Sequence, residues 1–262
     1  MYYLGGSVGI GTSTPAAKLD VNGSIKVNND ATTCSSVNAG AIRWSGTALQ
    51  GCDGASWAPL TSAPPQLKKQ IFTSSGIFTY PTGTTTSTVY KVTVVGGGGS
   101  GGNYAGGNGG SGGAAGGACI KWVSGMIAGQ TTTITVGSGG TAVDTSITNN
   151  LGNVGSGSSF SGGCSASGGG GAVGGYNGGA GTGGDINLTG GQGEGSHYVP
   201  SAANGAGGGG NSIFGGAGAG GGQINSGRLD AAGYGSGGAG GYGTLTNSGA
   251  GASGIVIVEW TQ

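Results

Sequence analysis

Glycine dominates the last two-thirds of this chain of 262 residues and restricts what it can fold into. All but 11 of the 72 glycines lie between Gly96 and Gly254, and two strand-like runs, Val89 to Val95 and Ile255 to Trp260, bracket this tract. Glycine loses more backbone freedom on folding than any other residue, roughly 0.5–1 kcal/mol relative to alanine in a helix or strand. The tract must therefore gain stability from some other source, or it remains a flexible linker.

The spacing within the tract indicates how the backbone could provide that stability. Residues 106–117 read GGNGGSGGAAGG, a three-residue period that matches the three residues per turn of a polyproline-II-type helix. Such a helix has no internal hydrogen bonds, so its N–H and C=O groups need partners on neighbouring segments. Collagen also has glycine at every third residue, but here the register breaks at Ala115, and Pro200 is the only proline beyond Pro81. We therefore predict a mostly β, elongated, fibre-like protein with a short β stem and a C-terminal bundle of polyglycine-II helices.

Charge and hydropathy exclude several kinds of partner. Only 6% of the residues are charged, and the formal net charge is zero. The chain has no basic stripe, so we expect no nucleic-acid partner. No apolar run approaches the length of about 18 residues that a membrane helix needs, so we expect no membrane insertion. The first residues, MYYLGG, show no basic and apolar regions of an export signal.

The four cysteines allow three pairings. Cys34 and Cys52 lie close together before the glycine tract, and Cys119 and Cys164 both lie inside it. The simplest prediction is two local disulfides, Cys34 to Cys52 and Cys119 to Cys164. Four buried free thiols in a reducing compartment are the alternative. We expect no metal and no cofactor, because no CxxC pair occurs and the single histidine has no neighbour at ligand spacing.

The first part of the chain consists of short apolar alternations between turn residues. Residues 5–28 read GGSVGIGTSTPAAKLDVNGSIKVN, in which Asn22-Gly23 predicts a hairpin turn. Strands this short bury too little alone, so we expect them to pair with other copies of the chain. The stretch VGIGTSTPAAKLDVNG resembles a segment that recurs in the tail fibres of tailed phages. That resemblance implies intertwined, trimeric β-structure.

We predict four regions along the chain, which are residues 1–30, 31–60, 61–69 and 70–262. The first is an oligomerising β stem, and the second is a β module that contains Cys34 and Cys52. Within that module 41–44 and 48–51 are predicted as strands, and Asp53-Gly54 as a turn. Residues 61–69 contain Pro64-Pro65 and are predicted as a linker. The last region is a glycine-rich domain that combines a β base with the glycine bundle, its predicted strands being 71–80, 88–95, 119–123, 132–136 and 255–260.

The glycine-rich region also carries a resemblance of its own. The order of VYKVTVVGGGG, ACIKWV, GQTTTITVGSGG, long glycine runs and a closing GIVIVEW resembles the glycine-rich C-terminal domains of phage tail fibres. It is also similar to the tip adhesins of T-even-like phages. The resemblance implies polyglycine helices whose intervening loops bind a host receptor.

No catalytic constellation stands out in the sequence, so we predict that the chain is not an enzyme. The loops that interrupt the glycine runs are the better candidates for function, because binding residues concentrate on loops of rigid scaffolds. These predicted loops are 143–154, 185–204, 223–234 and 242–248. The candidate receptor-binding residues are Tyr176, His197, Tyr198, Tyr234 and Tyr242. Tyrosines that only cap the edges of the bundle are the alternative interpretation.

Together these observations predict the distal part of a viral tail fibre, extracellular on the virion, that binds the bacterial host surface. The expected partners are the chain itself, as a homotrimer, and a host surface polysaccharide or outer-membrane protein. The alternative is a structural subunit of a self-assembling extracellular filament.

Overall fold

The computed structural model describes residues 6–60, 65–103, 109–144, 151–172, 177–196, 205–219, 229–241 and 247–262. The chain forms two compact units, which we call unit 1 (Met1–Pro64) and unit 2 (Pro65–Gln262). Regular structure in the described residues consists of strands and one short 3-10 helix, which confirms the prediction of a mostly β protein. These residues include no helix with the length and apolar character needed to cross a membrane.

Unit 1 consists of two small sheets. Strand β1 (Val8–Ile10) pairs in parallel with β2 (Leu19–Val21). After the 3-10 helix η1 (Ser36–Asn38), β3 (Ile42–Trp44), β4 (Leu49–Cys52) and β5 (Trp57–Pro59) form an antiparallel meander. Strands β3 and β4 agree with the two strands predicted there from the sequence, whereas β5 was not predicted.

The predicted hairpin at Asn22-Gly23 is wrong. The amide of Asn22 donates to the carbonyl of Ile10 at 2.9 Å, which extends the β1–β2 ladder instead of closing a turn. The pattern of alternating apolar residues was correct for β1 and β2. It did not reveal that the residues between them cross over to give a parallel pair.

A disulfide and one arginine hold the meander of unit 1 together. Cys34 and Cys52 are bonded as predicted, and they are the only apolar residues buried in the described part of this unit. The Arg43 guanidinium lies 4.2 Å from the centre of the Trp57 ring and donates to Gln50 Oε1 at 3.0 Å. Arg43 is therefore accounted for by contacts within its own module.

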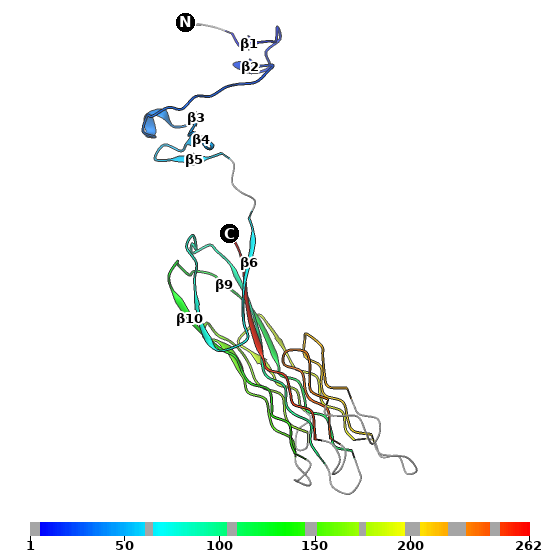
Figure 1. The fold of residues 1–262 in the computed structure, drawn as a ribbon. Coiled ribbons are helices and arrows are strands. Elements are labelled where there is room, and N and C mark those ends of the chain that lie inside the picture. Colours follow the sequence, from blue (N-terminus) through cyan, green and yellow to red (C-terminus); the bar gives the residue numbers. More distant parts are fainter. Residues whose placement is uncertain are drawn as a thin grey trace. The chain divides into compact units, whose positions relative to one another are not determined.

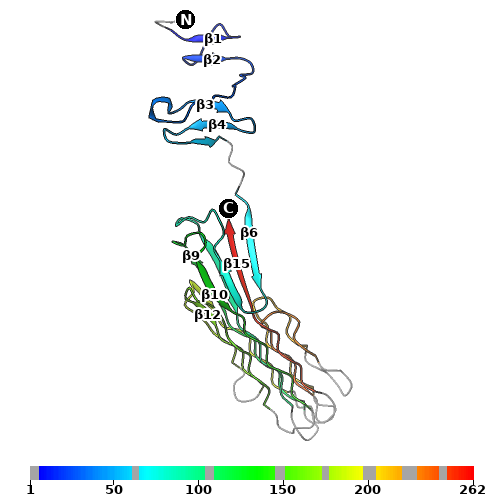
Figure 2. The ribbon, with the colours of Figure 1, turned by 60° about the vertical axis from the view of Figure 1, so that its left-hand side comes forward.

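Unit 2 is a sandwich of two five-stranded antiparallel sheets (Figures 1 and 2). The front sheet has the order β14 (Ile186–Leu188), β9 (Ala118–Val123), β8 (Tyr90–Val95), β15 (Ile255–Thr261) and β6 (Leu67–Phe72). The back sheet has the order β13 (Gly181–Thr182), β12 (Cys164–Ala166), β11 (Ser158–Phe160), β10 (Thr131–Thr135) and β7 (Gly76–Thr79).

Aromatic rings and a disulfide fill the space between the two sheets. Phe78 makes edge-to-face contacts with Tyr80, Tyr90 and Trp260 at ring-centre distances of 5.0, 5.9 and 5.8 Å. The second predicted disulfide, between Cys119 of β9 and Cys164 of β12, covalently joins the front sheet to the back sheet. The predicted β base therefore exists and has a conventional core.

Two strand boundaries differ from the prediction. The run 71–80 was expected to form one strand, but residues 73–75 turn the chain from β6 in the front sheet to β7 in the back sheet. Strand β6 begins at Leu67, inside the range 61–69 that was predicted as linker. The two strand-like runs that bracket the tract are strands and pair with each other, because Val95 at its entry lies opposite Ile255 at its exit.

The strands continue directly into the glycine-rich segments, which run side by side away from the sandwich (Figures 1 and 2). Backbone hydrogen bonds join neighbouring segments into an assembly that we call the glycine bundle, and their partners repeat every three residues. The amides of residues 97 to 102 donate in turn to the carbonyls of Ser156, Ala252, Ala114, Asn153, Gly249 and Ser111. Each third amide along segment 96–103 therefore points to the same neighbour, which is segment 151–157, 247–254 or 109–117.

Two central segments are surrounded by others. Besides its three acceptors, segment 96–103 accepts hydrogen bonds from Gly140, Gly169 and Gly238, which belong to three further segments. Segment 109–117 is likewise bonded to six neighbours. The backbone of the tract thus supplies the lateral partners that its side chains cannot provide.

The close approach of the backbones requires glycine at particular positions. A Cβ atom built on Gly98 would meet the backbone of Ser236, and one built on Gly240 would meet the backbone of Gly110, in both cases well inside 3.0 Å. Real Cβ atoms do not approach other atoms so closely. Glycine is therefore required at the positions where two backbones come this close, whereas Ser100, Ala114 and Ala115 are buried at other positions of the same segments.

Candidate functional site

Most of the predicted receptor-binding residues lie outside the part of the chain that the structure describes. These are Tyr176, His197, Tyr198 and Tyr242. Tyr234 is described and has an exposed fraction of 42%, and its carbonyl accepts a hydrogen bond of 2.6 Å from Ser212 Oγ. A role for these five residues stays a prediction.

The structure redraws the boundaries of the predicted loops. The range 185–204 includes strand β14 and residues 189–196, which hydrogen-bond within the bundle. The range 223–234 ends in residues 229–234, which also bond to bundle segments. The parts of these ranges left over for loops are shorter than the sequence suggested.

The outward faces of the two sheets of unit 2 differ sharply in chemistry. On the back sheet the outward residues are nearly all hydroxyl-bearing, with Ile77 as the large apolar exception. They are Thr79, Thr131, Thr133, Thr135, Ser159, Ser165 and Thr182. An antiparallel sheet commonly packs one face on the core and exposes a polar face to water, and the back sheet follows this rule.

The front sheet does not follow this rule. Its outward side, which we call the front face, carries large apolar side chains on its strands and on the adjacent loops. Those with exposed fractions above 36% are Leu67, Ile71, Val89, Trp122, Ile186, Leu188, Ile213 and Phe214. Large contiguous apolar surfaces are uncommon on isolated soluble domains and mark interaction sites.

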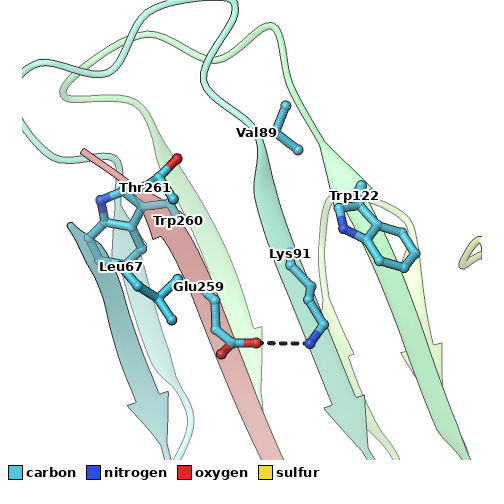
Figure 3. Close-up of a pocket in the computed structure, with 7 residues that line it drawn as sticks. All are labelled: Leu67, Val89, Lys91, Trp122, Glu259, Trp260 and Thr261. Carbon is cyan, nitrogen blue, oxygen red and sulfur yellow. Dashed lines mark ion pairs between the residues drawn. The ribbon is translucent and has the colours of Figure 1, made fainter. Parts of the chain in front are cut away.

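A groove of about 330 Å³ lies on the front face (Figure 3). It is lined by Leu67, Val89, Lys91, Trp122, Glu259, Trp260 and Thr261. Lys91 of β8 and Glu259 of β15 reach toward each other across its floor and form an ion pair of 3.1 Å. Trp122 lies on one side of this pair and Leu67 on the other. The groove combines an aromatic side chain, an apolar wall and one donor–acceptor pair.

A second hollow of about 300 Å³ extends this surface toward the glycine bundle. It shares Lys91 and Glu259 with the first hollow, and Ile213 and Phe214 close its far end. Below it the front face is covered, since Val95 and Ile255 are buried and Gly235 of the bundle lies against the Val95 side chain. The exposed apolar surface is therefore the part of the front face that the bundle leaves open.

The front face has the chemistry of a binding surface. Binding pockets are mostly apolar with a few placed polar groups, which matches the Lys91–Glu259 pair among apolar side chains. No group of three or more His, Cys, Asp or Glu residues that could hold a metal ion occurs in the described ranges. Sequence reasoning missed this surface, because Lys91, Trp122 and Glu259 meet only through the strand register.

Comparison with known proteins assigns unit 2. A family model for the glycine-rich domain matches residues 73–261. The chain belongs to the glycine-rich domain family. The match begins after β6 and ends at the last residue of β15, so it covers nine of the ten strands of the sandwich and the glycine-rich segments between them. A search of curated proteins finds no match to the chain.

Proposed function

We propose that this glycine-rich domain protein is a non-enzymatic fibre protein, the distal part of a viral tail fibre that attaches to a bacterial surface. In this proposal unit 1 is a stem that assembles with other copies, and unit 2 is a rigid head. The observation that carries the proposal is the laterally bonded glycine bundle, which extends the sandwich as a scaffold. The sequence resemblance of both units to phage tail fibres supports the same function.

We further propose that the glycine-rich segments are polyglycine-II helices. The three-residue period of their hydrogen-bond partners is the support for this assignment, because a helix with three residues per turn points every third amide in one direction. The six neighbours of segment 96–103 fit the packing of such helices in a bundle. A bundle of this kind suits a tip, because it holds the chain stiffly without side chains.

The receptor-binding residues are proposed to lie where the bundle segments are interrupted. The described segments that border the interruptions run away from the sandwich, toward one end of unit 2 (Figure 1). Residues 197–204, which include two of the five candidates, join the bundle segments 189–196 and 205–211. A host polysaccharide or an outer-membrane protein is the proposed ligand.

A binding experiment with the full chain tests the attachment function. The purified chain is applied to immobilised surface polysaccharides and outer-membrane proteins of candidate hosts. In a variant, residues 197–204 are replaced by a Gly/Ser segment of equal length, which leaves β14 and the bundle segments intact. The matched control replaces the exposed hydroxyl residues Thr131 and Thr133 by alanine. We expect binding to fall at least about tenfold in the variant alone; equal binding by variant and control would refute the loop assignment.

Self-assembly of the stem is proposed from the surface of unit 1. Its strands expose Val8, Ile10, Leu19, Ile42 and Trp44, and a two-stranded sheet such as β1–β2 is marginal on its own. A homotrimer that covers these side chains is the favoured assembly. Sedimentation of the full chain should give a multiple of 24.3 kDa. Polar substitution of the exposed residues of β1 and β2 should release monomers, whereas Ile77→Ser on the back sheet should not.

A subunit of an extracellular filament is the second candidate function. The apolar surface of unit 1 and the front face of unit 2 together could form contacts that propagate without closing. Electron microscopy distinguishes the two functions. Open-ended filaments of repeating subunits would refute the tip protein, and short closed trimers would refute the filament.

A further inference from the structure

We propose that the front face of unit 2 packs against the unit 2 of a second copy of this chain. The inference rests on the proposed function in one respect, since it takes unit 1 as the stem that gathers the copies. It adds where the heads meet. The occupant follows from three features of the molecule: the contrast between its two faces, the charge distribution of the front face, and the short connection to unit 1.

The back sheet serves as an internal control for the front sheet. Both belong to one sandwich and meet the same solvent, yet one face carries hydroxyl groups and the other exposes leucine, isoleucine, phenylalanine and tryptophan. Exposed apolar side chains on one of the two faces alone indicate that this face is covered in the assembled protein. The enrichment in aromatic and aliphatic side chains matches the core of a protein–protein interface.

The charges of the front face favour a flat protein surface as its occupant. Lys91 and Glu259 form an ion pair, and Lys69, which lies opposite Glu259 on β6, is the one further charged side chain that lines the two hollows, so the face carries little net charge to select an ionic ligand. The free edge strand β6 carries Lys68 and Lys69, and lysine on an edge discourages pairing with an added strand. The available contact is therefore through the face of the sheet, as in the packing of one sheet on another.

The connection to unit 1 identifies the flat partner as another copy. Only residues 61–64 separate the described parts of the two units, and the first front-face residue is Leu67. If unit 1 assembles, each head is tethered beside identical heads by this short connection. A short flexible tether raises the effective concentration of the tethered domains to the order of millimolar. The front faces of the neighbouring heads are then the most concentrated apolar surfaces that the groove can meet.

Reactivity of an engineered cysteine tests this contact in the full chain. Ile71→Cys places a thiol on the front face, where Ile71 lines the second hollow, and Thr133→Cys places one on the back face. Both residues are exposed in the single chain, and the four native cysteines are in disulfides. The rate of maleimide labelling is measured in chains whose assembly state is determined in parallel by sedimentation. In the assembled chain, we expect the Ile71→Cys variant to be labelled at least about tenfold more slowly than the Thr133→Cys variant.

The outcomes separate this inference from the proposed function. An assembled chain with equal labelling at the two positions would overturn the front-face contact and leave the stem intact. A chain that stays monomeric at all concentrations would overturn both. As a second measurement, Trp122→Glu should expose the thiol in the Ile71→Cys background without dissociating the stem. Protection that persists in this variant would also overturn the contact.

Discussion

Replacing Gly113 by alanine is the sharpest test of how the glycine bundle is held together. Gly113 lies in the central segment 109–117, and its amide donates to the carbonyl of Gly238 at 2.9 Å. A Cβ atom on Gly113 would lie 2.5 Å from the carbonyl oxygen of Ser100 and would also press on the carbonyl of Gly99. Both obstructing atoms belong to backbone, so no side chain can rotate away.

The cost follows from how far the two segments must separate. Ordinary van der Waals contact of a Cβ begins at 3.4 Å, so segment 96–103 must move by at least about 0.9 Å. Of the hydrogen bonds between the two segments, the two nearest Gly113, from Gly99 to Ala114 and from Gly102 to Ser111, are now 2.8 and 2.9 Å and would then exceed hydrogen-bonding distance. Two lost bonds at roughly 1 kcal/mol each, with buried groups left unsatisfied, lower the free energy of unfolding by about 2–4 kcal/mol.

Thermal and urea unfolding of two variants checks this magnitude. Gly195→Ala is the matched control, because Gly195 is exposed and nothing lies within 4 Å of its added Cβ. The control should be unchanged or more stable by roughly 0.4–1 kcal/mol, since alanine restricts the unfolded chain. Gly113→Ala should lower the midpoint of thermal unfolding by roughly 4–16 °C. If both variants had the same stability within about 0.5 kcal/mol, packing of bare backbones would not be what stabilises the tract.

Two further perturbations test other parts of the fold. Replacing Cys119 and Cys164 together by alanine removes a cross-link that spans 45 residues. The free energy of unfolding, measured by urea titration, should fall by about 4 kcal/mol. A loss below about 1 kcal/mol would contradict the stabilisation expected from cross-linking the two sheets. In unit 1 the amides of Ser56 and Ala55 donate to the Asp53 carboxylate and hold its pKa below the ordinary value of 3.8. The stabilisation from Asp53 is therefore present above pH 3.8 and is lost as the pH falls through the lower pKa of the folded state. NMR titration of the Asp53 carboxyl should give a midpoint below 3.8. A midpoint at or above that value would contradict the turn geometry.

The parts of the fold that could be predicted from sequence are those in which side chains alternate. The runs around Val92 and Val258 show strand periodicity, and the structure places both residues in the core. The disulfides could be predicted because each cysteine had one near partner in its own module. The turn at residues 73–75, which read TSS, was missed because apolar pairs flank it on both sides and no glycine or proline lies at its centre.

The front face could not be predicted, because no sequence pattern records which strands are neighbours. Trp122 lies opposite Lys91, and Lys91 lies opposite Glu259, only through the antiparallel registers of β9, β8 and β15. In sequence these three residues occupy separate strands with the glycine tract between them. A tryptophan beside a lysine in the run ACIKWV was therefore visible only as part of a strand.

The glycine tract raises a different problem, which is how its register is fixed. Glycine segments have no side chains to interlock, so a slip by three residues would satisfy the backbone hydrogen bonds equally well. Buried serines remove this degeneracy. Ser100 Oγ accepts from the amide of Asn153 at 2.8 Å, and Ser248 Oγ accepts from the amide of Val143 at 2.9 Å.

Each of these serines forms a bond that exists in only one register, and leaving its hydroxyl and the partner amide unsatisfied in a buried site is costly. The same holds where the tract leaves the back sheet, since Ser158 Oγ of β11 accepts from the amide of Gly137 at 2.9 Å. Glycine therefore determines how closely the segments approach, whereas the sparse serines determine which residues lie side by side. Because the interruptions of the bundle lie at the ends of these segments, the positions from which any receptor-binding loop departs depend on a few hydroxyl groups within the tract.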